Sequence, residues 1–199
     1  NERDVATVNL LLDVLEREIP KHFDQGTGEV TPRLSFWLEL LGRLARAELI
    51  EQLQSRSHSH LEALLTTMAC SRLGRTRRSF DPDLHNIRLL LLKIGGSGIT
   101  TLVNKELAHP DFYARLDGLA WALAKPDSET RRLLRNITES DLLTGTPPEP
   151  SEQLLATRAL AALHEDEAVI QWVLRWGLHA PADLTEWWEG HAPVSSERL

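Results

Sequence analysis

The sequence predicts an all-helical fold, and three observations lead to that prediction. Apolar residues recur three and four positions apart along most of the chain, as on the buried face of an amphipathic helix. Capping residues, several of them followed by proline, precede these stretches, and glycine or proline follows them. No stretch alternates apolar and polar residues for long enough to indicate a β-strand. We therefore expect one helical domain over residues 1–199.

The first three helices follow from this pattern. Residues 4–23 carry one apolar face, and the glycines of residues 24–28 interrupt it. Thr31 and Pro32 form a cap followed by proline, which predicts a second helix to about residue 54. Ser59 and Glu62 have the spacing of a capping box and predict a third helix that ends at Gly74.

The middle of the chain predicts four more helices. Asp81 and Pro82 begin one that ends at Gly95, and an apolar stretch covers residues 99–107. Pro110 begins the next helix, which Pro126 ends. Asp127 or Ser128 caps the helix that follows.

The last part of the chain begins with three prolines in residues 144–150, which predict an extended internal loop. Ser151 caps a helix that runs through Leu163, and another runs from about residue 169 to Gly177. A short final helix is expected around residues 183–189.

Composition limits the class of protein. The chain has 199 residues, 42% of them hydrophobic, and a net charge of −7. Its uninterrupted apolar runs, such as the four leucines of residues 89–92, are far shorter than the roughly 18 residues of a membrane span. Cys70 is the single cysteine, so no disulfide within the chain is possible, and we expect a reducing, cytoplasmic location. The chain begins without methionine, and we expect it to be part of a longer protein.

Charge is distributed unevenly. Residues 1–54 carry a net charge of −4, residues 55–135 carry +5, and residues 136–199 carry −8. Eighteen of the 22 basic residues are arginine, which favours bidentate pairing with carboxylate or phosphate.

An internal repeat links two segments. Residues 119–123 match residues 159–163 at an offset of 40, and the same offset places residues 133–135 on residues 173–175. A weaker copy lies 31 residues before the first. Spacings of this size are typical of stacked helical hairpins.

Within this repeat, residues 107–123 (LAHPDFYARLDGLAWAL) have a turn with proline and aspartate that leads into a helix with an arginine and small residues. This segment resembles a repeat of the HEAT and armadillo families, and the resemblance extends over residues 84–177. It implies an α-solenoid of stacked hairpins. The pattern of apolar residues alone also fits an irregular helical bundle.

Arginines form the first candidate site. Four of them gather around Gly74, and three more on a later helix would extend the same basic surface if stacking brought them alongside. Such a cluster can bind phosphate, nucleic acid or an acidic partner. The alternative is that these arginines pair with Asp81, Asp83 or the acidic flanks. The candidates are Arg72, Arg75, Arg77, Arg78, Arg131, Arg132 and Arg135.

Tryptophans form the second candidate site. Trp187 and Trp188 are adjacent, so a helix points them about 100° apart and leaves one of them exposed as a partner anchor. The alternative is that they cover the end of the core. Trp121, Trp172 and Trp176 fall on apolar helix faces and are expected in the core.

No catalytic or metal-binding motif is evident. His58 and His60 fall on different faces of a helix, and the glycines of residues 95–98 lack the lysine of a phosphate-binding loop. The sequence therefore predicts a protein without cofactor, metal or catalytic activity. We expect a scaffold or adaptor that binds another protein, with a HEAT-like nucleic-acid-binding protein as the alternative.

Overall fold

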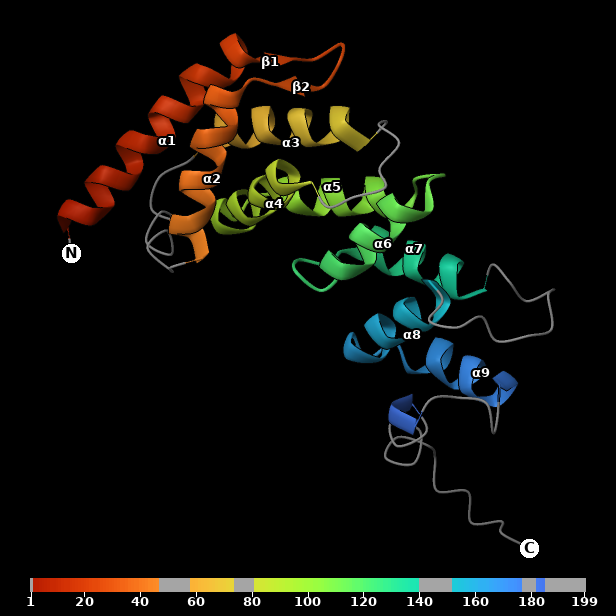
Figure 1. Ribbon diagram of the computed structural model, residues 1–199. Coiled ribbons are helices and arrows are strands. Elements are labelled where there is room, and N and C mark those ends of the chain that lie inside the picture. The colour runs from red at the N-terminus through yellow and green to blue at the C-terminus, as the bar shows by residue number, and fades with distance from the viewer. Residues whose placement is uncertain (1, 47–57, 74–80, 140–151, 177–181, 185–199) are drawn as a thin grey trace, which may run out of the picture.

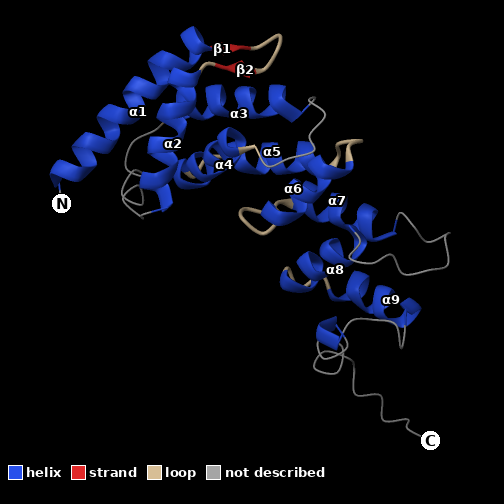
Figure 2. Cartoon of the chain, in the orientation of Figure 1, coloured by secondary structure: helices blue, strands red, loops and turns tan. Residues whose placement is uncertain are grey.

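The structure of this chain is a computed structural model, and it describes residues 2–46, 58–73, 81–139, 152–176 and 182–184. Within these ranges the chain is almost entirely helical (Figures 1 and 2), as the sequence predicts. The helices follow one another from α1 at the upper left of Figure 1 to α9 at the lower right. Their bounds are α1 Glu2–His22, α2 Pro32–Arg46, α3 Ser59–Leu73, α4 Pro82–Ile94, α5 Gly98–Leu107, α6 Phe112–Trp121, α7 Ser128–Glu139, α8 Glu152–Ala162 and α9 Asp166–Trp176.

A two-stranded hairpin between α1 and α2 is not predicted by the sequence. β1 (Phe23–Asp24) pairs antiparallel with β2 (Glu29–Val30). The Asp24 carboxylate accepts a hydrogen bond from the Gly26 N–H at 2.8 Å, and Gly28 has a φ of 65°, a value that suits glycine. Strands of two residues are too short to show alternation, so the sequence shows only the interruption of a helix.

The core of the first half is formed by α1 to α5. Leu12, Leu38, Leu65 and Leu91 come from four of these helices, and each has no exposed surface. α2 packs against α1 and α4, while α3 packs against α1, α4 and α5. Burial of this kind contributes about 1.5–3 kcal/mol for each large apolar side chain.

Several predicted helix ends are confirmed. The Asp81 carboxylate accepts a hydrogen bond from the Leu84 N–H at 3.1 Å, and Asp111 caps α6 in the same way. Gly95 ends α4 with a φ of 82° in the left-handed region. α6 begins two residues after the expected Pro110, because the carboxylate of Asp111 caps it.

Following the repeat in the sequence, we call the consecutive helix pairs α4 with α5, α6 with α7 and α8 with α9 the first, second and third hairpin; the closest packing among these helices, however, is that of α5 on α6 and of α7 on α8. In residue numbering, an offset of 40 places the bounds of α6 on those of α8 and the bounds of α7 within two or three residues of those of α9. α5 packs against α6 and α7, while α8 packs against α6, α7 and α9.

Polar contacts join the turns of neighbouring hairpins. Lys125, in the turn of the second hairpin, donates from Nζ to the carbonyl oxygens of Gly95 and Gly96 in the first, at 2.6 and 2.7 Å. Arg131 reaches the turn of the third hairpin, where it donates to the Leu163 carbonyl at 3.0 Å. These contacts fix the hairpins relative to one another.

Glu62 differs from its predicted role. The expected capping box would turn its carboxylate back to the start of α3. Instead, Glu62 Oε1 accepts a hydrogen bond from the Gly98 N–H at 2.5 Å, at the start of α5. α3 does begin at Ser59, so the helix boundary is confirmed although the side-chain contact is different.

A buried ionic cluster lies where the first hairpin meets the second. Arg88 on α4 donates to Glu106 on α5 at 2.5 Å and to Asp117 on α6 at 2.8 Å. Glu106 has no exposed surface. A Cβ at Gly118 would lie 2.9 Å from the Leu107 nitrogen, so glycine allows α5 and α6 to approach closely here.

Some expectations fall outside the described residues. They are the extension of the second helix to about residue 54, the loop at residues 144–150 and the end of the final helix at residues 183–189. The described helix α2 ends at Arg46.

Candidate functional site

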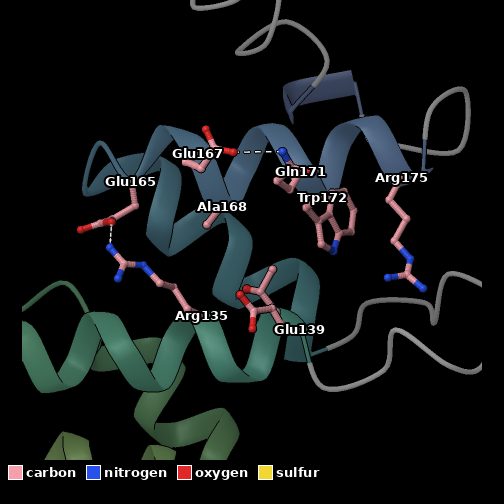
Figure 3. A pocket seen from close by; sticks show the side chains of 9 residues that line it. Arg135, Glu139, Glu165, Glu167, Ala168, Gln171, Trp172 and Arg175 are labelled. Atoms are coloured by element: carbon pink, nitrogen blue, oxygen red, sulfur yellow. Dashed lines mark hydrogen bonds and ion pairs between the residues drawn. The ribbon is translucent and has the colours of Figure 1, made fainter.

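The candidate site is a groove between α7 and α9, the second helices of successive hairpins (Figure 3). Its volume is about 660 Å³, within the range of pockets that hold ligands. Only a few contacts join α7 to α9 directly, which leaves space between them. The lining residues are Arg135, Thr138, Glu139, Glu165, Glu167, Ala168, Gln171, Trp172 and Arg175.

Trp172 provides the apolar part of the groove. Its indole projects from α9 into the space between the helices, where Glu139 projects from α7 (Figure 3). Trp172 is 7% exposed, as expected for a core tryptophan, but it also lines the groove. An aromatic side chain surrounded by polar groups is typical of the centre of a protein interface.

Glu165 is the best-paired acid of the groove. Arg135 and Arg131 both donate to its carboxylate, the latter at 2.8 Å. The hydrogen bond from Arg135, followed by that from Arg131, lowers the pKa of Glu165 below its ordinary value. Glu165 is therefore held ionised, which is the opposite of what a general acid requires.

Thr138 places an unsatisfied polar group in the groove. The residue is 7% exposed, and its Oγ1 has no hydrogen-bond partner within the structure. A threonine within a helix can satisfy its hydroxyl by donating to the carbonyl four residues earlier. Thr157 on α8 does so, with a hydrogen bond of 2.7 Å to the carbonyl of Gln153. The Thr138 hydroxyl is therefore a buried polar group without a partner among the described residues.

The arginines predicted as an anion site lie in different surroundings. Arg72 is buried and pairs with Asp81 at 2.8 Å and Asp83 at 3.6 Å, while also donating to the Gly28 carbonyl. This arrangement matches the alternative of pairing with nearby aspartates. Arg72 therefore links α3 to the turn of the β-hairpin and to the start of α4.

The three arginines of α7 are also paired. Arg131 and Arg135 bind Glu165, and Arg132 binds Glu129 on its own helix. Arg75, Arg77 and Arg78, like Trp187 and Trp188, lie outside the described residues.

A second groove lies between the first helices of the last two hairpins. It is lined by Leu116 and Leu119 of α6, by Leu123 just after α6 and by Leu155 of α8, and its volume is about 410 Å³. Arg158 at its edge pairs with Asp183 at 2.7 Å, and the neighbouring Leu184 is buried. The two grooves therefore differ in chemistry, one apolar and the other charged.

The structure also places the remaining polar candidates. His58 is buried, while His60 lies 3.9 Å from Glu16. Cys70 is half-buried, and burial raises the pKa of its thiol. Among the described residues, no group of His, Cys, Asp and Glu is arranged to hold a metal ion. None of the helices described here is both long and apolar enough to cross a membrane.

Sequence reasoning missed most of this groove because its residues were assigned elsewhere. Arg135 was expected on a basic surface and Trp172 in the core. The 40-residue offset does relate Arg135 to Arg175, and both line the groove. That equivalence could have indicated that α7 and α9 share a site. Only the structure shows that the two helices are separated by a groove at these residues.

Comparison with known proteins adds no relative to this description. No family model, curated protein or solved structure matches the chain, so its relationship to HEAT and armadillo repeats stays a prediction.

Proposed function

We propose that this chain is a non-catalytic interaction module of stacked helical hairpins, and that a partner protein docks in the groove between α7 and α9. The observation that carries the proposal is the groove itself, with a buried tryptophan at its centre and charged side chains at its rim. Protein interfaces have this arrangement of apolar centre and polar rim.

The arrangement of the hairpins supports the proposal. Stacked hairpins form extended surfaces from equivalent helices. The repeat offset and the contacts between successive turns are what a HEAT-like α-solenoid would have. In that arrangement α5, α7 and α9 occupy equivalent positions, and the groove lies between two of them.

The nucleic-acid alternative has less support. It relied on a cluster of arginines free to bind phosphate. Arg72, Arg131, Arg132 and Arg135 are instead bound to carboxylates of the same chain. An anionic ligand would have to displace those carboxylates.

Affinity capture from the native lysate of the source organism tests the proposal. The bait is the full chain, compared with an Ala168→Arg variant that fills the groove. Ala120→Arg is the matched control, because Ala120 lines the groove between α6 and α8. Nuclease treatment separates protein partners from nucleic acid.

We expect a nuclease-resistant partner that the original chain and Ala120→Arg capture and that Ala168→Arg loses. Thermal unfolding checks that each variant folds. Gln171→Arg, at an exposed position of the same groove, gives a second blocking variant. Capture that survives both blocking variants would place the partner elsewhere and overturn the proposed site.

A further inference from the structure

We infer that the α7–α9 groove takes a basic segment of its protein partner, with a lysine or arginine side chain between the indole of Trp172 and the carboxylate of Glu139. This inference rests on the proposed function and specifies the chemistry of the partner. Three properties of the groove lead to it: its unneutralised charge, its unsatisfied hydroxyl and its aromatic ring.

The unneutralised charge is negative. Glu165 is bound by two arginines, and Glu167 accepts a hydrogen bond from the Gln171 amide at 2.9 Å. Arg175 is engaged in an interaction as well. Because the Gln171 amide is neutral, Glu167 keeps its negative charge, and Glu139 has neither an ion pair nor a hydrogen bond with any residue that the structure describes, so it is the carboxylate with no partner to displace.

The surrounding sequence has the same sign. Between residues 128 and 184, the residues that the structure describes carry a net charge of −2, so the field around the groove favours cations over anions. An acidic segment would face that field and the carboxylate of Glu139. A purely apolar segment would remove Glu139 from water without giving it a partner, which is unfavourable.

The unsatisfied hydroxyl indicates that the ligand includes a hydrogen-bonding group such as a peptide backbone. A buried polar group without a partner costs about 1–3 kcal/mol. Thr66 and Thr157 avoid that cost by donating to helix carbonyls at 2.8 and 2.7 Å, whereas Thr138 does not. A carbonyl of a bound segment would accept the hydrogen bond that Thr138 lacks.

The aromatic ring completes the site for a cation. The face of an indole attracts an ammonium or guanidinium group, and the attraction is stronger where water is excluded. Trp172 is largely buried and Glu139 lies on the facing helix, so a basic side chain inserted here meets both groups (Figure 3).

Fluorescence anisotropy with designed peptides tests the inference. The probe is a labelled amphipathic peptide of leucine, alanine and lysine, about 14 residues or four helical turns long. Two matched peptides replace every lysine with glutamate or with glutamine. All three are titrated with the full chain at about 0.05 M and 0.3 M salt.

We expect saturable binding of the lysine peptide, with at least about tenfold weaker binding of the other two and weaker binding at high salt. Glu139→Gln should weaken binding of the lysine peptide about fivefold. Glu129→Gln, on the same helix but outside the groove, is the matched control and should leave binding unchanged.

Thr138→Val provides a readout that a structural role alone would not give. Removal of an unsatisfied hydroxyl should raise the melting temperature of the protein. The same change should weaken binding of the lysine peptide a few fold. A variant that merely damaged the fold would lower both.

Two results would overturn the inference and leave the proposed function standing. In the first, the glutamine peptide binds as well as the lysine peptide and Ala168→Arg blocks both. In the second, Glu139→Gln and Glu129→Gln have the same effect. If no peptide binds, the basic segment is wrong, and the capture experiment decides the proposed function separately.

Discussion

The two halves of this chain are stabilised differently. Before residue 108, leucines without exposed surface come from every helix: Leu12, Leu15, Leu34, Leu38, Leu41, Leu61, Leu65, Leu84, Leu90, Leu91 and Leu102. In the described residues after it, Leu134 and Leu160 are the leucines with none. The second half relies more on ion pairs between hairpins, such as Arg115 with Glu152 at 2.8 and 2.7 Å.

This difference matters for function. A dense core determines one arrangement of helices but leaves little space for a ligand. Hairpins joined by polar contacts at their ends keep their relative positions while leaving grooves between them. Both grooves described above lie between helices of the second half, whereas in the first half a pocket of about 430 Å³ lies beside the β-hairpin and outside the packed helices.

The largest expected effect comes from the core of the first half. Leu38→Ala removes a side chain without exposed surface and should lower the free energy of unfolding by about 3–4 kcal/mol. Denaturant unfolding measures this loss. Leu174→Ala, at a position on α9 that is 60% exposed, is the control and should change stability by less than about 0.5 kcal/mol. Equal losses of unfolding free energy for Leu38→Ala and Leu174→Ala would contradict the difference in burial between these two leucines.

An intermediate effect is expected where the halves meet. Gly118→Ala puts a Cβ 2.9 Å from the Leu107 nitrogen and the same distance from the Glu106 Cβ, so α5 and α6 must separate. We expect a loss of about 1–3 kcal/mol by thermal unfolding. Gly26→Ala is the control, because a Cβ at Gly26 would lie an ordinary 3.4 Å from the nearest atom, Asp24 Oδ1. An unchanged melting temperature for Gly118→Ala would show that this close approach is wrong.

The smallest effect is expected in the second half and depends on pH. Arg135 and Arg131 lower the pKa of Glu165, so this pair of interactions stabilises the fold above the ordinary carboxyl pKa and is lost as the pH falls through the lowered value. Glu165→Gln should therefore reduce the melting temperature slightly at neutral pH, and the difference should shrink as the pH falls through the lowered pKa of Glu165. A difference that persists in acid would mean that the side chain acts through packing.

Much of the fold was predictable because local signals and packing agree. Asp81 with Pro82 and Gly95 determine helix ends through contacts within a few residues, and the structure confirms them, whereas α6 begins after Asp111 and not at the expected Pro110. The β-hairpin was not predictable, because its turn depends on Asp24 and Gly28 and its strands are only two residues long.

Side-chain partners across the fold were harder to predict. Glu62 binds Gly98, 36 residues away, and Arg72 is buried against Asp81 and the Gly28 carbonyl. In the sequence alone, Glu62 is equally compatible with a capping box within its own helix, and Arg72 with a cluster of arginines on the surface. Only the packing of helices decides between a local partner and a distant one, and the groove was missed for the same reason.

The contacts between turns also determine how the chain would respond to a pulling force. Lys125 bridges to the carbonyl oxygens of Gly95 and Gly96, and Arg131 makes the corresponding link to the next turn, so tension applied at the ends passes through the hairpins in series. The weakest link gives way first in such an arrangement. With fewer fully buried leucines, the last hairpin would extend before the first helices do, and the α7–α9 groove would be the first surface lost under load.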